Sequence, residues 1–130
     1  MVGDLFLLHP DSIRAAGLRM LGDGHEVGSW TTPLFDFVDA FRRRPSPELL
    51  AEPPVDLHSD RLNALVAGTV EALCVEAELP APAWCQAVPP LSEPWFVAGV
   101  ENLKASALAE AAVPFRKRNV FVLGNFLHRA

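Results

Sequence analysis

Apolar residues recur at helical spacing most regularly in the middle of the chain. Between positions 59 and 78 they follow the i, i+3, i+4, i+7 pattern of a helix lying on a core, through Leu62, Leu65, Val66, Thr69, Val70, Leu73 and Ala77. Ser59 or Asp60 is suited to cap its first turn, because both side chains accept hydrogen bonds from backbone N–H groups. The opposite face, which we expect to be solvated, carries Arg61, Asn63, Glu71 and Glu78.

Four shorter segments also predict helices. They cover Pro10–Leu21, Thr32–Arg44, about 100–112 and Pro114–Arg118. Thr32 followed by Pro33 is typical of a cap and a first helical position, and Pro45 must end that helix. Its buried face is expected to hold Leu34, Phe37, Val38 and Phe41.

Extended structure is predicted in only one convincing place, Val120–Val122, with Leu5–Leu8 as its possible partner. Asn119 before it suits a left-handed cap, and Asn125 after it suits the cap of a terminal turn. Trp84 and Trp95 stand among prolines and are expected to plug the ends of a bundle. The fold class is therefore mainly α, a small bundle of about five helices with at most a minimal two-stranded β element.

The length favours a single domain spanning residues 1–130. Prolines gather in clusters between positions 33 and 94, and each cluster stops any helix that reaches it. There is no internal repeat and no Gly/Ser linker, so these clusters indicate turns inside one domain.

Charge is distributed unevenly along the chain. From Pro45 to Val100 eight acidic residues face Arg61 alone, a net charge of −7, whereas the last thirty residues carry two acidic and five basic side chains, a net of +3. Two basic triplets, Arg42-Arg43-Arg44 and Arg116-Lys117-Arg118, flank this acidic middle. An overall charge of −5 opposes unspecific phosphate binding as the main activity, although a local basic patch can still meet an acidic partner.

The compartment and the membrane relation follow from apolar runs and cysteines. No apolar run approaches the roughly 18 residues of a membrane helix, and Asp4 precedes the only short apolar stretch near the start. Two cysteines do not build a disulfide framework. We therefore expect a cytoplasmic protein without membrane contact.

Catalytic and metal-binding motifs do not emerge. No two histidines stand at i, i+4, and Cys74 and Cys85 do not form a C-x-x-C pair, so both cysteines are interpreted as small packing residues. There is no G-x-S-x-G elbow, no G-K-[ST], and Gly22-Asp23-Gly24 lacks the remainder of a dinucleotide fingerprint. The expectation is no catalytic residue, no cofactor and no metal.

The last nineteen residues combine phenylalanines with the second basic triplet and permit two interpretations. In the first, Phe115, Phe121 and Phe126 close the core while the basic side chains stay solvated. In the second, aromatic and basic side chains together form a docking surface, with the triplet displayed at a helix end. The second interpretation, extended to the rest of the chain, gives these candidate partner-binding residues: Arg42, Arg43, Arg44, Glu71, Glu76, Glu78, Trp95, Phe115, Arg116, Lys117 and Arg118.

Several short motifs resemble a small actinobacterial family. They are Leu79–Trp84 (LPAPAW), Pro94–Phe96 (PWF), Pro114–Val122 (PFRKRNVFV) and the closing Phe126–Ala130 (FLHRA), and the resemblance covers roughly residues 49–130. Such domains occur alone or behind helix-turn-helix regions, near toxin–antitoxin-type genes, which implies an antitoxin or regulatory role. Here the first two predicted helices are too far apart for a helix-turn-helix.

Three function classes remain. The leading hypothesis is a non-catalytic protein-binding domain, the antitoxin or regulatory partner of another protein, whose acidic middle faces a basic cleft. The first alternative is a DNA-binding transcriptional regulator that uses the two basic triplets. The second is a small enzyme acting through a cysteine or a histidine.

Overall fold

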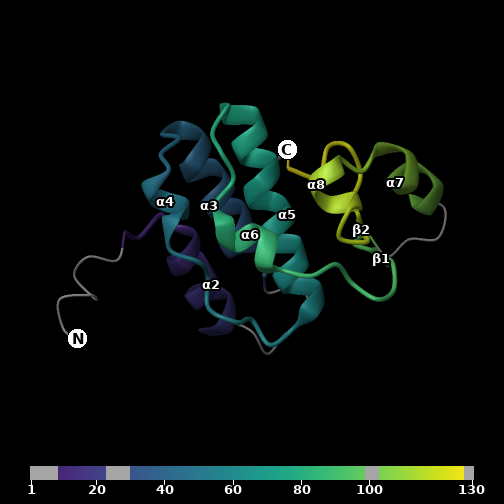
Figure 1. Cartoon of the computed structure of the whole chain (residues 1–130), viewed down its shortest axis with the longest axis horizontal. Helices are drawn as coiled ribbons and strands as arrows, with labels where there is room; N and C mark the ends of the chain where they lie inside the picture. The colour runs from purple at the N-terminus through teal and green to yellow at the C-terminus, as the bar shows by residue number, and fades with distance from the viewer. Residues whose placement is uncertain (1–8, 23–29, 99–102, 128–130) are drawn as a thin grey trace. The chain divides into compact units, whose positions relative to one another are not determined.

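The structure is a computed structural model that describes residues 9–22, 30–98 and 103–127. In these ranges the chain is mainly helical, with seven helices and one two-stranded parallel sheet (Figure 1). This confirms the predicted fold class. No described helix is long and apolar enough to cross a membrane.

The chain divides into two compact units, Met1–Leu57 and His58–Ala130. The prediction of a single domain stays a prediction, since a compact unit is not by itself an independent domain. The described part of the first unit contains α2 (Ile13–Gly22), α3 (Thr31–Arg43) and the short α4 (Glu48–Ala51), which no sequence pattern predicted. Helix α2 packs against both α3 and α4.

Helix α3 buries the predicted face and differs from the prediction at its start. Leu34, Phe37, Val38 and Phe41 are all buried, as expected. The cap position, however, is Trp30 rather than Thr32, because the backbone of Trp30 is already helical and its carbonyl accepts from the Leu34 N–H. At the other end the helix stops at Arg43, two residues before Pro45.

The second unit is built on α5 (Asp60–Ala77), the long helix predicted from the apolar stripe. Ser59 caps it as expected, accepting from the Leu62 N–H at 3.2 Å. Two short helices, α6 (Ala83–Ala87) and α8 (Val113–Arg116), contact α5, whereas α7 (Lys104–Glu110) contacts the strand that follows α8. Helix α6 was not predicted. Helix α7 corresponds to the predicted helix at about 100–112, of which residues 100–102 lie outside the described ranges.

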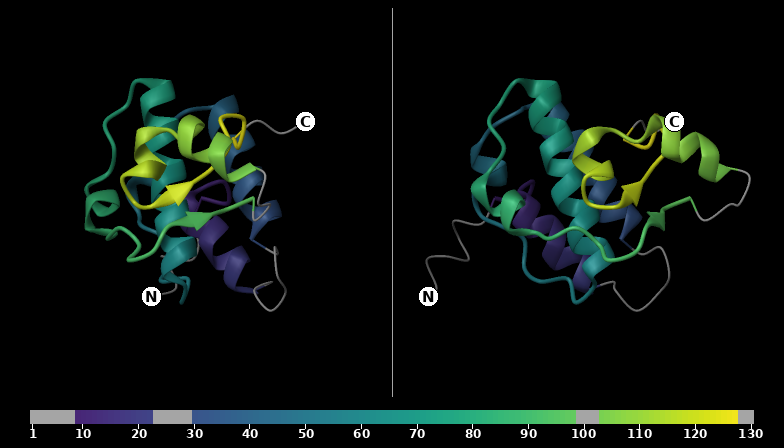
Figure 2. Two further views of the ribbon diagram at one scale, coloured as in Figure 1. Left: turned by 90° about the vertical axis from the view of Figure 1, so that its right-hand side faces the viewer. Right: turned by 45° about the vertical axis from the view of Figure 1, so that its right-hand side comes forward.

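Two short strands complete the second unit. Strand β1 (Trp95–Phe96) pairs in parallel with β2 (Val120–Phe121), with Trp95 opposite Val120 (Figure 2). Strand β2 was predicted, but its partner here is a segment that we expected to plug a bundle end. Leu5–Leu8, the partner suggested by the sequence, lies outside the described residues.

Candidate functional site

The basic triplet at positions 116–118 follows a short helix that is pressed against α5. Pro114 stands in the first turn of α8, where its missing N–H costs nothing. Gly68 of α5 allows the close approach, because a Cβ at this position would lie 2.7 Å from Cδ1 of Phe115. Asn119 then adopts the predicted left-handed backbone, with φ of 63°. The chain therefore turns sharply after α8, at Asn119.

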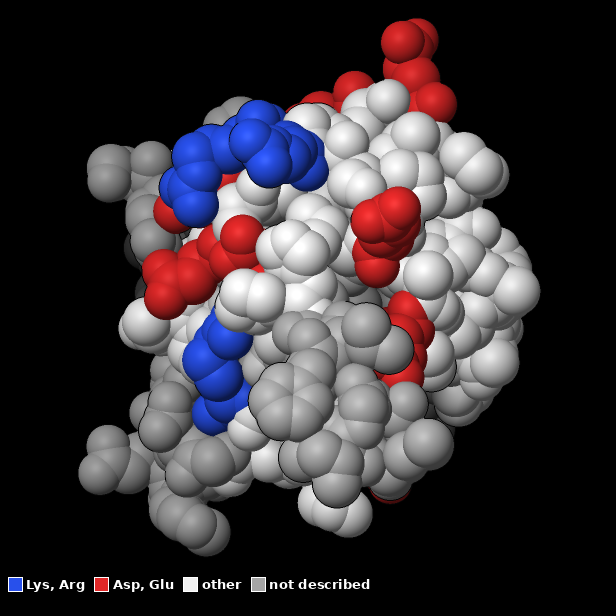
Figure 3. All heavy atoms as spheres, turned by 90° about the vertical axis from the view of Figure 1, so that its left-hand side faces the viewer, with Lys and Arg blue, Asp and Glu red and all other residues white. Residues whose placement is uncertain are grey.

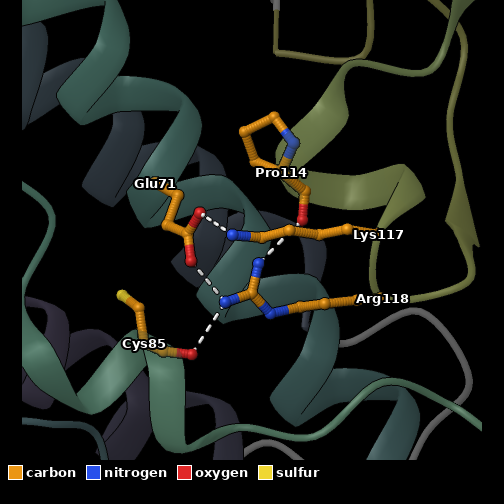
Figure 4. Close-up of polar contacts among 5 residues, drawn as sticks. All are labelled: Glu71, Cys85, Pro114, Lys117 and Arg118. Atoms are coloured by element: carbon orange, nitrogen blue, oxygen red, sulfur yellow. Dashed lines mark hydrogen bonds and ion pairs between the residues drawn. The ribbon is translucent and has the colours of Figure 1, made fainter.

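Arg118 points inward and joins three segments (Figure 4). Its Nη2 donates to Oε1 of Glu71 on α5 and, at 2.7 Å, to the carbonyl of Cys85 on α6. Its Nη1 donates to the Pro114 carbonyl at 2.8 Å. Its Nε is buried and has no hydrogen-bond partner within the described residues. The rigid guanidinium fork thus ties α8 to α5 and α6.

Glu71 uses both carboxylate oxygens in this cluster. The second oxygen, Oε2, lies 2.7 Å from Nζ of Lys117. Burial alone would raise the pKa of Glu71, but the hydrogen bonds and positive charges of Arg118 and Lys117 outweigh it and hold the pKa below its ordinary value. Glu71 therefore stays ionised at neutral pH.

These contacts correct three of the predicted partner-binding residues. Glu71, Phe115 and Arg118 are 7%, 2% and 3% exposed, so their side chains hold the second unit together and present no surface to a partner. Glu71 was also expected on the solvated face of α5, and Arg118 among the solvated basic residues. Each of these two charges can be buried because it forms an ion pair with the other.

The two cysteines are buried next to this cluster. Burial, with a further contribution from the negative charge of Glu71, raises the pKa of the Cys85 thiol to about 12, and the same two causes raise the pKa of Cys74. Both thiols thus remain protonated at neutral pH and are poor nucleophiles. This agrees with their interpretation as packing residues.

Exposed apolar side chains gather on α7 and α8. Leu108 is 50% exposed and Val113 is 67% exposed, on helices separated only by Ala111 and Ala112. Arg116 links the two helices by donating to the Ala109 carbonyl at 3.4 Å, and its side chain remains exposed. We call Leu108, Val113, Arg116 and Lys117 the α7–α8 surface.

A second exposed group occupies the C-terminal end of α5. Val75 is 72% exposed, and Glu76 and Glu78 beside it are exposed as well. Glu78 closes the helix in a left-handed conformation, with φ of 58°. Two of the predicted acidic partner-binding residues therefore do lie at the surface, at the negative end of the helix dipole.

Trp95 is only partly available to a partner. Its ring lies beneath the Arg61 guanidinium, whose carbon is 5.5 Å from the ring centroid. The neighbouring Phe96 is covered in the same way by Lys104, at 5.3 Å. Both rings are half-buried and already have a cation over one face.

The first basic triplet ends α3. Arg43 and Arg44 are exposed and Arg42 is half-buried. Arg43 and Arg44 line an open hollow of about 430 Å³ together with His9, Asp11, Ser46 and Glu48. Figure 3 shows the side of the molecule on which α4 lies in Figure 1, where basic and acidic side chains lie next to one another.

No three His, Cys, Asp or Glu side chains in the described ranges are placed to hold a metal ion together. Comparison with known proteins adds no assignment: no family model matches the chain, and neither a characterised protein nor a solved structure is significantly similar to it. The candidate sites therefore rest on the geometry of this chain alone.

Proposed function

We propose that this chain is a non-catalytic protein-binding domain and that the α7–α8 surface is where its partner docks. The supporting observation is the exposure of Leu108 and Val113 on consecutive helices, which Arg116, three residues after Val113, links through its hydrogen bond to the Ala109 carbonyl. Exposed apolar side chains mark surfaces that other proteins cover, and arginine is one of the residues enriched at protein interfaces.

The charges of this surface define the partner's chemistry. Arg116 and Lys117 are exposed on the same side of α8 as Val113, since they follow it at i+3 and i+4. The Lys117 ammonium group already contacts Glu71, so Arg116 is the positive charge that this surface offers to a partner. A partner that covers this surface needs an apolar depression with carboxylates at its rim. The acidic end of α5 is the alternative contact, for a basic partner.

The proposed role of the complex is regulatory. The resemblance to domains found near toxin–antitoxin-type genes supports an antitoxin or a regulatory partner, and products of neighbouring genes are the first candidates to test. A domain of this kind acts by occupying a surface of its partner, which needs a docking surface and no catalytic group.

The test is capture of a stoichiometric partner from the native host, followed by direct binding measurements with two matched variants. Val113→Glu reverses the character of the α7–α8 surface, and an acidic residue in the first turn of α8 is compatible with the helix. Val75→Glu makes the same change at a valine of similar exposure on α5. Both variants are checked for an unchanged melting temperature.

We expect Val113→Glu to weaken the complex at least about a hundredfold, as loss of a central contact does, and Val75→Glu to leave it nearly unchanged. The opposite result would place the partner on the acidic end of α5. Salt-dependent retardation of DNA without any protein partner would instead favour the DNA-binding alternative, with fewer phosphate contacts than two full triplets provide because Arg118 is buried.

A further inference from the structure

The first unit contains a hollow whose lining carries charged side chains of both signs. Arg43 and Arg44 at the end of α3 supply two positive charges, and Asp11 and Glu48 supply two negative ones. Among the described residues none of these four side chains has an ion-pair partner. Charged groups that line a hollow and do not form ion pairs with one another have donors and acceptors available for a ligand.

Two further polar side chains in the lining have a defined orientation. His9 Nδ1 accepts from the Asp11 N–H at 3.0 Å, so in the neutral ring the proton is on Nε2, which is then a donor. Ser46 Oγ accepts from the Glu48 N–H at 3.3 Å, which leaves its own O–H as a donor. The hollow therefore offers a ligand hydrogen-bond donors from the two arginines, His9 and Ser46. The two carboxylates offer it hydrogen-bond acceptors.

The volume and the charge balance limit the ligand. A hollow of about 430 Å³ is within the range of about 300–1,000 Å³ that small-molecule sites occupy. The formal charges of the four ionised groups cancel. A simple anion would gain from the arginines and be repelled by the carboxylates, and a simple cation would meet the reverse. A ligand with one group of each sign satisfies both.

We propose that this hollow binds a small zwitterion, a free α-amino acid, with its carboxylate on Arg43 and Arg44 and its ammonium group on Asp11 and Glu48. Arginine suits the first role because its planar fork matches the two carboxylate oxygens. Ala40 and Leu49, which complete the lining, face the ligand's side chain with apolar surface. This proposal concerns the first unit and does not depend on the α7–α8 surface.

The test is calorimetric titration of the full chain with the common L-α-amino acids, followed by two derivatives of the one that binds most tightly. Its amide lacks the carboxylate and its N-acetyl derivative lacks the ammonium group. We expect each derivative to bind at least about tenfold more weakly than the parent. Inorganic phosphate serves as the simple anion.

Variants connect each end of the ligand to its predicted residues. The double variant Arg43→Gln/Arg44→Gln is expected to weaken binding of the parent about tenfold or more and not to weaken binding of the amide, whose single positive charge the arginines repel. Asp11→Asn/Glu48→Gln is expected to weaken binding of the parent similarly and not to weaken binding of the N-acetyl derivative, whose negative charge the two carboxylates repel. Arg61→Gln and Glu93→Gln, exposed residues of the second unit outside the α7–α8 surface, are the matched controls and should leave binding of the amino acid unchanged.

Two results would overturn the proposal. If phosphate or the N-acetyl derivative binds as tightly as the parent amino acid, the hollow is an anion site and the carboxylates have no role. If no amino acid gives a binding signal up to about 10 mM while the chain remains folded, the hollow has no such ligand. Melting curves of every variant separate a lost site from a lost fold.

Discussion

Arg118 and Glu71, 47 residues apart in the chain, form an ion pair that is buried on both sides, with exposed side-chain fractions of 4% and 8%. Two further N–H groups of the guanidinium donate to backbone carbonyls and the second oxygen of Glu71 contacts Lys117, and these contacts offset part of the cost of burying the two charges. It connects the end of α8 to the middle of α5.

Removing Arg118 should destabilise the protein far more than removing its neighbour. Arg118→Ala leaves a buried carboxylate without its main partner, so we expect the free energy of unfolding to fall by about 3–5 kcal/mol. Lys117→Ala, which removes a contact to the same carboxylate from an exposed side chain, should cost about 1 kcal/mol or less. Urea unfolding of both variants measures the difference. Equal losses would show that the buried ion pair contributes no more to the free energy of unfolding than the exposed Lys117 contact does.

The stability conferred by Glu71 should depend on pH in a defined direction. Its pKa is lower in the folded than in the unfolded chain, so its stabilising effect is complete above the ordinary value of 4.5 and is lost as the pH falls through the lowered value. Glu71→Gln cannot lose a proton. The stability gap between the native chain and this variant should therefore shrink on going from pH 7 to about pH 3. A gap that stays constant would contradict the assignment.

Gly68→Ala should reverse the usual helical preference. Alanine normally stabilises a helix by about 1 kcal/mol over glycine. Here the new Cβ would lie 2.7 Å from the Phe115 ring and 3.3 Å from the Pro114 carbonyl oxygen, so we expect a net loss of about 1–3 kcal/mol. Thermal unfolding checks this prediction. In a chain that already carries Phe115→Leu, whose smaller side chain leaves room for the new Cβ, Gly68→Ala should cost less stability than in the native chain.

Glu78→Gly should stabilise the protein. Glu78 ends α5 with φ of 58°, a conformation that glycine adopts without steric cost, so we expect a gain of about 0.5–1 kcal/mol. The matched control is Glu76→Gly, inside the last turn of the same helix, which should destabilise by about 1 kcal/mol. The two melting temperatures should move in opposite directions.

The cysteines should resist alkylation while the protein is folded. With the pKa of Cys85 at about 12 and that of Cys74 also raised, almost no thiolate forms at pH 8. We expect iodoacetamide to leave both residues unmodified in the native protein and to modify both in guanidinium chloride, as peptide mass spectrometry would detect. Rapid modification of Cys85 in the folded chain would indicate an accessible thiol.

The features that the sequence predicted correctly are determined by residues close to one another in the chain. Ser59 caps α5, Asn119 adopts the left-handed conformation, and the apolar face of α3 is buried, all as local chemistry dictates. Helices α4 and α6 escaped prediction because four or five residues are too few for a periodic pattern. The pairing of β2 with β1 depends on how the chain returns from α8, which no local pattern describes.

The candidate site was harder to predict because its residues are distant in the chain. Arg116, Lys117 and Arg118 look alike in the sequence, and only the turn at Asn119 decides which of them points inward. One signal was present: Ala64 and Gly68 precede Glu71 by seven and three residues, on the same face of α5. Small residues on one face permit close approach of another segment, and a carboxylate beside them then needs a cation from that segment.

The long sequence separation of Glu71 and Arg118 also affects synthesis. Chains emerge from the ribosome N-terminus first, so α5 is made well before α8 and the residues after it. Until Arg118 emerges, Glu71 lacks the cation that makes its burial favourable, and Gly68 lacks the ring of Phe115. The His58–Ala130 unit therefore completes its folding only after Arg118 has left the ribosome, and a nascent chain stalled before that point would present an incomplete unit to chaperones and proteases.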